Sequence, residues 1–173
     1  MTDVVSPKKR SEMMAGIRGS DTTPELRVRR ALFSMGYRYR LHRKDLPGTP
    51  DIVLPARRVA IFVNGCFWHG HAGCRFAKIP STRTEFWTQK FEQNRQRDRS
   101  AVAALLEKKW RVLVVWECFT RKSPQETAIA VAIKQWMDST SVQGELDAIA
   151  RPEEPVDDTQ AESLNLPLNS THK

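Results

Sequence analysis

Three cysteines and a histidine have the types and spacing of metal ligands. Cys66, His71 and Cys74 fall within one short stretch, and Cys118 follows much later in the chain. A Cys3His set supplies the four ligands of a closed structural zinc site, in which each thiol binds as a thiolate. Such a site would use every cysteine of the chain and would fix a long irregular loop. The alternative is three buried thiols beside an incidental histidine.

Asp51, His69 and Glu25 are of the types that phosphodiester hydrolysis uses. Asp51 opens an expected strand, where its carboxylate and a main-chain carbonyl of the next strand would form a hard oxygen site for Mg²⁺. His69 is two residues from His71, so both cannot easily bind one ion, and His69 is left to act as a base or to hold a phosphate. A purely structural histidine is the alternative.

Glu25 is expected at the edge of the apolar face of a helix, from where it could converge with Asp51 and His69 on one phosphate. The alternative is that its charge stabilises the helix N-terminus. Asn94 and Asp98 occupy the inward stripe of a long predicted helix, where apolar residues are usual. Because inward polar groups need partners, we interpret these two as outer-shell partners of metal-bound water.

The chain carries a net charge of +8, and its acidic residues are concentrated after residue 140. A body this basic suggests a polyanion such as nucleic acid as partner, although a solvated basic surface is the alternative. Phe67 and Trp68, in the irregular loop, could then enter a base step and unstack it, or be buried in a core. No run approaches the roughly 20 apolar residues of a membrane helix, so we expect no membrane partner and a soluble, cytoplasmic protein.

The elements that must position these residues follow from hydrophobic periodicity and turn signals. Helices are expected over 23–35, 84–109 and 124–139, and strands over 37–42, 51–54, 59–63 and 111–116. This order predicts an α/β domain with a mixed central sheet flanked by helices. We divide the chain into a basic N-terminal arm or helix (1–20), this domain (21–140) and an acidic tail expected to be disordered (141–173).

Four motifs carry a resemblance to a known family. They are Pro-Gly-Thr-Pro-Asp (47–51), Ile-Phe-Val-Asn-Gly-Cys-Phe-Trp-His-Gly-His (61–71), Thr-Arg-Thr-Glu-Phe-Trp (82–87) and Trp-Arg-Val-Leu-Val-Val-Trp-Glu-Cys (110–118). With them, over about residues 6–138, the chain closely resembles the very short patch repair (Vsr) endonucleases. The resemblance implies a restriction-endonuclease-like fold with a structural zinc site, in which residues 21–140 form the endonuclease domain.

The resemblance also implies a function. Vsr endonucleases nick double-stranded DNA on the 5′ side of the thymine in a T:G mismatch that arises from deaminated 5-methylcytosine. We therefore expect a Mg²⁺-dependent DNA-repair hydrolase, monomeric and nucleoid-associated, with mismatch-repair proteins as further partners. The alternatives are a restriction-type nuclease on matched duplex and a zinc-dependent DNA-binding module without hydrolysis.

By the same resemblance, each candidate residue receives a role. Asp51 and the main-chain oxygen of Val63 would bind Mg²⁺, His69 would be the general base, and Glu25 would hold metal-bound water. The zinc ligands would be Cys66, His71, Cys74 and Cys118, and the intercalating aromatics Phe67, Trp68 and Trp87. Asn64 stands where the best-known members have a second active-site histidine; its amide can hydrogen-bond a phosphate but cannot exchange protons near pH 7.

Overall fold

A five-stranded mixed sheet organises the protein, and the computed structural model describes residues 19–123 and 125–149 of it. The strands, in spatial order, are β1 (Arg40–Leu41), β2 (Ile52–Leu54), β3 (Val59–Asn64), β4 (Arg111–Trp116) and β5 (Gln143–Leu146). The pairings β1–β2 and β2–β3 are antiparallel, whereas β3–β4 and β4–β5 are parallel. The predicted mixed α/β architecture is therefore confirmed.

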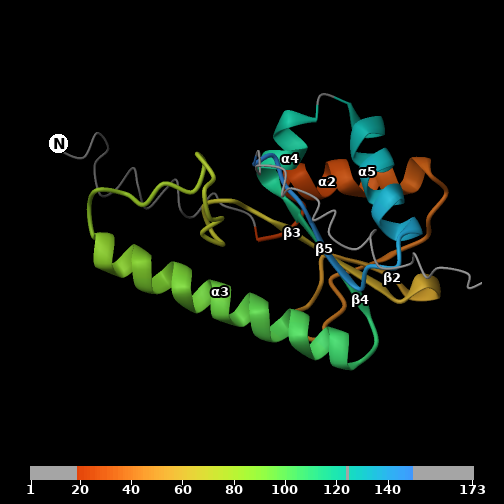
Figure 1. The fold of residues 1–173 in the computed structure, drawn as a ribbon, viewed down its shortest axis with the longest axis horizontal. Helices are drawn as coiled ribbons and strands as arrows, with labels where there is room; N and C mark the ends of the chain where they lie inside the picture. Colours follow the sequence, from red (N-terminus) through yellow and green to blue (C-terminus); the bar gives the residue numbers. More distant parts are fainter. Residues whose placement is uncertain (1–18, 124, 150–173) are drawn as a thin grey trace, which may run out of the picture.

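Helices cover both faces of the sheet (Figure 1). They are α2 (Thr23–Ser34), α3 (Thr84–Glu107), α4 (Glu117–Lys122) and α5 (Glu126–Asp138), with a 3-10 turn, η1 (Pro55–Arg57), between β2 and β3. The helices α2, α4 and α5 lie on one side and α3 lies on the other. Within the described residues, no helix is both long and apolar enough to cross a membrane.

The alternation of side chains along the strands explains this layering. Ile52 and Leu54 pack with the apolar residues of α2 and α5, whereas Val53 between them packs with Leu105 of α3. Successive strand side chains point to opposite faces, so a strand buried on both sides has apolar residues throughout. All three residues of β2 are buried accordingly.

The N-terminus of α2 has the expected cap. Thr22 has extended backbone angles, and its hydroxyl oxygen accepts a hydrogen bond from the main-chain N–H of Glu25 at 3.5 Å. Pro24 lies in the first turn, where a missing N–H costs little. This local structure places Glu25 in the first turn of a helix whose inner face contacts the sheet.

Two segments differ from the sequence-based expectation. The strand expected over 37–42 is reduced to Arg40–Leu41, because β2 offers only short pairing, with Arg40 opposite Val53 and Leu41 opposite Ile52. The segment before the last helix forms the additional helix α4, directly after β4. The predicted basic arm lies almost entirely outside the described residues.

The domain boundary expected at residue 140 is corrected by β5. Residues Gln143–Leu146, which the acidic composition assigned to a disordered tail, pair in parallel with Val112–Val115. Leu146 also packs against the main core. An edge strand needs only one inward apolar side chain because main-chain hydrogen bonds hold it, so composition alone missed it. Residues 150–173 lie outside the described residues.

Candidate active site

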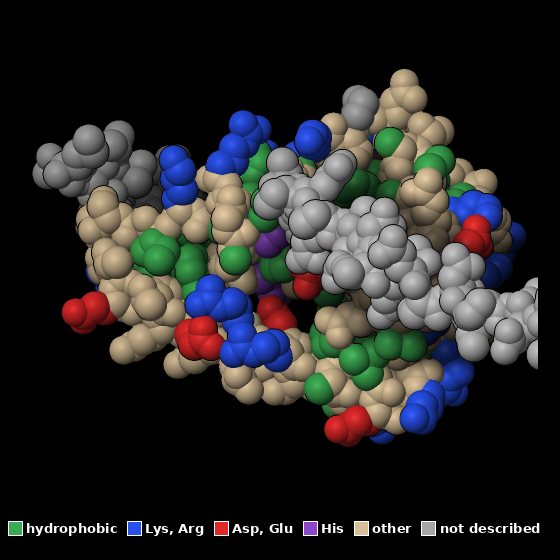
Figure 2. Space-filling model, in the orientation of Figure 1, with side chains coloured by type: hydrophobic (Ala, Val, Ile, Leu, Met, Phe, Trp, Pro, Cys, Tyr) green, Lys and Arg blue, Asp and Glu red, His purple; other side chains and the backbone are tan. Residues whose placement is uncertain are grey.

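A cavity of about 680 Å³ opens where β2 and β3 meet the middle of α3. Several of the side chains that line it were selected from the sequence, and these selected residues come from four separate segments of the chain. The cavity is lined by the predicted residues Glu25, Asp51, Val63, Asn64, Trp68, His69 and Asp98, together with Arg97 and Glu117 among others. Figure 2 shows histidine and acidic side chains side by side in a hollow on one face of the molecule.

Asp51 is held by the strand next to it. Its Oδ2 accepts a hydrogen bond from the main-chain N–H of Val63 at 2.7 Å, so the carboxylate lies directly beside the backbone of residue 63. Burial raises the pKa of Asp51, and the nearby negative charge of Glu25 adds to this, while the bond from Val63 opposes it. Burial makes the charged form of this carboxylate less favourable, so a cation next to it would stabilise that form.

Glu25 is almost fully buried, with 3% of its surface exposed, and a set of donors compensates its charge. Its Oε2 accepts hydrogen bonds from the Arg29 guanidinium at 2.8 Å and from the main-chain N–H of Asp21 at 3.0 Å. Its Oε1 accepts one from the Thr22 hydroxyl at 3.0 Å. The acid on the inner edge of α2 is therefore a paired charge at the cavity wall, and Arg29 is a partner that sequence reasoning missed.

His42 links this pair to Asp51. Its Nε2 lies 3.0 Å from the Arg29 guanidinium, and its Nδ1 lies 3.8 Å from Oδ1 of Asp51. Because a guanidinium only donates hydrogen bonds, Nε2 of His42 accepts and Nδ1 carries the proton on the Asp51 side. Sequence reasoning placed His42 only at the end of a strand; its proximity to Asp51 depends on the β1–β2 pairing.

Asp21, Glu25 and His42 also lie close enough together to suggest a metal site. The Arg29 guanidinium, however, contacts all three side chains. A fixed cation already occupies the position that a metal ion would take, so these residues form a salt-bridge network.

His69 is oriented by α3. Its Nδ1 lies 2.6 Å from Oδ2 of Asp98, a hydrogen bond in which the ring donates to the carboxylate. In the neutral ring, Nε2 then carries the lone pair that can take up a proton. This contact places Asp98 against the imidazole, whereas its predicted role next to metal-bound water stays a prediction.

Asn94, the other polar residue of the inward stripe, supports the loop that precedes His69. Its amide donates a hydrogen bond to the main-chain oxygen of Trp68 and accepts one from Arg97. Asn94 is buried, and these bonds satisfy its polar groups. The structure therefore gives Asn94 a structural partner, and its predicted contact with metal-bound water stays a prediction.

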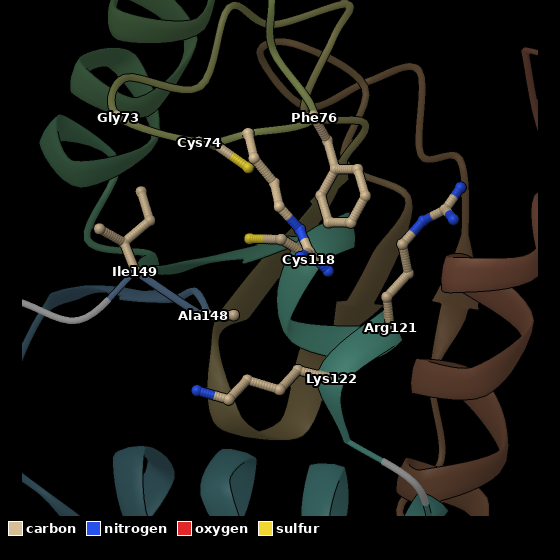
Figure 3. A pocket seen from close by; sticks show the side chains of 9 residues that line it. Gly73, Cys74, Phe76, Cys118, Arg121, Lys122, Ala148 and Ile149 are labelled. Carbon is tan, nitrogen blue, oxygen red and sulfur yellow. The ribbon is translucent and has the colours of Figure 1, made fainter.

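The four predicted zinc ligands meet at a second site, between the segment that follows β3 and the start of α4. The ligand atoms of Cys66, His71, Cys74 and Cys118 all lie within 4.8 Å of one another. His71 presents Nδ1 to the sulfur of Cys66 at 3.5 Å and to that of Cys118 at 3.6 Å. Figure 3 shows the thiols of Cys74 and Cys118 pointing into the same space.

The electrostatics of this cluster favour a bound cation. Burial raises the pKa of both Cys66 and Cys118. The charge of a neighbouring thiolate, Cys118 in the case of Cys66 and Cys74 in the case of Cys118, raises it further. A divalent cation would offset these effects because it binds the thiolate and lowers the cost of its charge. Three sulfurs and one imidazole nitrogen are also the donors that zinc prefers in structural sites. The residues present thus fit such an ion.

Aromatic rings form a cluster between the loop and the start of α3. The Phe67 ring contacts those of Trp68, Trp87 and Phe91, with centroids 5.0–5.2 Å apart in edge-to-face arrangements. Phe67, Trp68 and Trp87 are half-buried and lie outside the main core. Phe86, which sequence reasoning did not single out, packs on Trp87 and is 45% exposed.

Comparison with known proteins decides the family. A family model described as DNA mismatch endonuclease Vsr matches residues 2–75. The chain is also 39% identical over 149 residues to the DNA mismatch endonuclease Vsr of Escherichia coli, an alignment that covers 85% of this chain and 95% of the relative. The protein belongs to the Vsr family. The predicted relationship is therefore confirmed.

Other relatives of the chain are named as type II nicking enzymes. The chain is 56% identical over 118 residues to V.XorIIP of Xanthomonas oryzae pv. oryzae, covering 68% of this chain and 86% of the relative. It is 42% identical over 118 residues to V.NmeAIP of Neisseria meningitidis, covering 68% of this chain and 84% of the relative.

Glu117 is a further acidic residue at the cavity of this Vsr protein that sequence reasoning missed. It directly follows β4, and its Oε2 accepts a hydrogen bond from the main-chain N–H of Cys66 at 3.3 Å. Its other oxygen bonds to Arg121. Glu117 lines the cavity and also binds the backbone of Cys66. It therefore connects the cavity with the Cys/His cluster. Its neighbour Cys118 was a signal that could have drawn attention to it.

Proposed function

We propose that this Vsr-family protein is a Mg²⁺-dependent endonuclease that nicks duplex DNA on the 5′ side of the thymine in a T:G mismatch. The observation that carries the proposal is one cavity lined by both Asp51 and the hydrogen-bonded His69–Asp98 pair. The half-buried aromatic cluster begins next to His69, at Trp68. The printed names of the relatives, which describe a mismatch endonuclease and nicking enzymes, support the reaction class.

Asp51 and the main-chain oxygen of Val63 would hold the magnesium ion. The hydrogen bond between Asp51 and the N–H of residue 63 keeps the carboxylate beside that backbone, and hard oxygen donors suit Mg²⁺. When bound, the ion would supply positive charge for the negative charge that develops on the phosphate and the leaving oxygen. Glu25 faces the same cavity, and a carboxylate oxygen accepts more than one hydrogen bond, so we assign it to an active-site water.

His69 would act as the general base. Its hydrogen bond to Asp98 fixes the ring and leaves Nε2 to take the proton of the attacking water. Asn64 is 93% buried at the cavity wall, and its amide would donate a hydrogen bond to a phosphate oxygen. In this arrangement a single histidine performs the proton transfer, and Asn64 contributes binding without exchanging a proton.

Phe67, Trp68 and Trp87 would enter the DNA at the mismatch. Rings that are only half-buried retain a surface on which bases can stack. A mismatched pair costs less to unstack than a matched one, so insertion of rings would favour the lesion. The cluster adjoins His69 through Trp68, which would put the deformed base step close to the phosphate to be cleaved.

Zinc at the Cys66–His71–Cys74–Cys118 cluster would fix the loop that carries these aromatics. In the structure, residues 65–83 contain no helix or strand. A metal ion that joins this loop to Cys118 of α4 would supply the free energy that ordering it requires. We further propose that the mixed sheet and its helices represent the restriction-endonuclease-like fold that the family resemblance implies.

The proposal is tested with a labelled duplex that carries one T:G pair, in the presence of Mg²⁺. Asp51→Ala and His69→Ala should each abolish nicking while mismatch binding is retained. Asp138→Ala is the control, because Asp138 is exposed on α5 and pairs with Lys134. Equal cleavage of T:G and T:A duplexes would instead indicate a nuclease that acts on matched DNA.

A further inference from the structure

The segment that follows α5 lies against the Cys/His cluster. Glu145 of β5 accepts a hydrogen bond from Nε1 of Trp116 at 2.9 Å. Ala148 and Ile149 line a cavity together with Cys74 and Cys118, and Figure 3 shows them beside the two thiols.

Asp147 of this segment faces the one histidine of the cluster. Oδ2 of Asp147 lies 3.8 Å from Nε2 of His71, and both side chains are more than nine-tenths buried. The other ring nitrogen, Nδ1, faces the sulfurs of Cys66 and Cys118. The imidazole therefore lies between the thiols on one edge and a carboxylate on the other.

Two further contacts define this geometry. The His71 ring stacks on Trp116, with centroids 3.8 Å apart and the planes 2° from parallel. Oδ1 of Asp147 accepts a hydrogen bond from the main-chain N–H of Ile149 at 3.0 Å. This bond turns Oδ2 toward the His71 ring. The ring is fixed on its face by Trp116 and at its edge by Asp147.

An imidazole that binds a metal through Nδ1 carries its proton on Nε2. A carboxylate near that proton stabilises this tautomer, orients the ring and makes the ligating nitrogen a better donor. Burial strengthens the attraction because solvent screens it less. Asp147 is placed to have this effect on His71 once Nδ1 binds an ion.

We infer that Asp147 is a positioning residue of the metal site, and that residues 143–149 form part of that site through β5. The inference rests on the proposed zinc ion. The inference predicts that zinc affinity depends on the negative charge of Asp147, although Asp147 contributes no ligand atom. It also means that the acidic segment after residue 140 supports the cluster instead of serving only as a solvated tail.

The test is a zinc-affinity measurement on the full chain, with a chromophoric chelator as competitor. Asp147→Asn keeps the size and an oxygen acceptor for the Ile149 N–H but removes the charge. We expect its zinc affinity to fall about 10- to 100-fold, the range for loss of an outer-shell partner of a metal-bound histidine. Asp138→Asn, on the exposed face of α5, should leave the affinity unchanged.

Two further measurements separate positioning from general stability. Saturating Co²⁺ should give the same Cys3His absorption spectrum in the wild type and Asp147→Asn, because the four ligands are unchanged. The metal-free melting temperatures should also agree, whereas the rise in melting temperature at a fixed, non-saturating zinc concentration should be smaller in the variant.

The outcomes are distinct. A wild-type chain that binds no zinc would overturn the proposed zinc site itself. A wild-type chain that binds zinc, together with Asp147→Asn of equal affinity, would overturn only the role of Asp147. That role is also overturned if the variant loses as much stability without metal as with it, because Asp147 would then serve folding alone.

Discussion

Nδ1 of His69 and Oδ2 of Asp98 lie 2.6 Å apart, although 29 positions separate the two residues in the chain. One belongs to the loop after β3 and the other to the middle of α3. This hydrogen bond joins the proposed base to a helix that also packs on the sheet. The orientation of the imidazole is thereby tied to α3 as well as to the loop that carries His69.

Asp98→Ala should lower the nicking rate at saturating substrate. Without the carboxylate, His69 can rotate and adopt the other tautomer, so we expect a loss of about 10²-fold or more in kcat. KM should change little, because Asp98 is not assigned to DNA binding. Steady-state nicking rates over a range of T:G duplex concentrations give both constants. A rise in KM with unchanged kcat would contradict the role.

Arg29→Ala should destabilise the protein strongly. It leaves the buried carboxylate of Glu25 without its cationic partner, and breaking such a pair typically costs about 3–5 kcal/mol. The neighbouring Arg30→Ala is the matched control, because Arg30 pairs with Glu126 at the surface and its loss should cost less than about 1 kcal/mol. Urea unfolding gives both values, and equal losses would argue against a buried ion pair.

The metal-free Asp51→Asn protein should be more stable than the wild type at neutral pH. Because burial raises the pKa of Asp51 in the folded state, the folded protein holds this proton more tightly than the unfolded chain does. The free energy of unfolding therefore falls as the pH rises from below the ordinary value of 3.8 through the raised pKa. Urea unfolding without Mg²⁺ should show the two proteins converging at low pH. If Asp51→Asn were more stable by the same amount at every pH, the raised pKa of Asp51 could not be the reason.

Cys118→Ser should abolish stoichiometric zinc binding. Elemental analysis of the wild type is expected to find about one zinc per chain, because a closed structural site needs four ligands. Removal of zinc by a chelator should lower the melting temperature of the wild type and leave that of the variant unaffected. A zinc-free chain with an unchanged melting temperature would rule out the site.

Trp68→Ala should reduce discrimination between T:G and T:A duplexes more than it reduces overall affinity. The ring is half-buried in the aromatic cluster, and stacking on a base is worth about 1–3 kcal/mol. Phe33→Ala is the control, because Phe33 is 64% exposed on α2, on the other side of the sheet from α3. Competition binding with the two duplexes separates the two effects. Equal weakening on both would indicate that Trp68 only packs.

Local patterns in the sequence predicted much of the candidate site. The four cluster residues could be selected because thiols and imidazole are scarce, and one short stretch contains three of the four. Asp51 and Glu25 were found from their places at the starts of a strand and a helix, and the structure brings both to one cavity with His69. Period and capping signals act over a few residues, which is why α2 and β3 were expected close to their observed positions.

Long-range pairing decided what the sequence left open. His42 gains its relation to Arg29 and Asp51 only when α2, β1 and β2 come together. Arg29 and Glu25, in contrast, lie one turn apart on α2. Strand β5 escaped detection because its one inward apolar residue, Leu146, gives no hydrophobic period. The residue types on their own indicated which chemistry to expect and roughly where the elements of the chain begin. Which acid faces which imidazole was settled only by the packing of α3 and β5 on the sheet, because this packing brings together side chains that lie far apart in the chain.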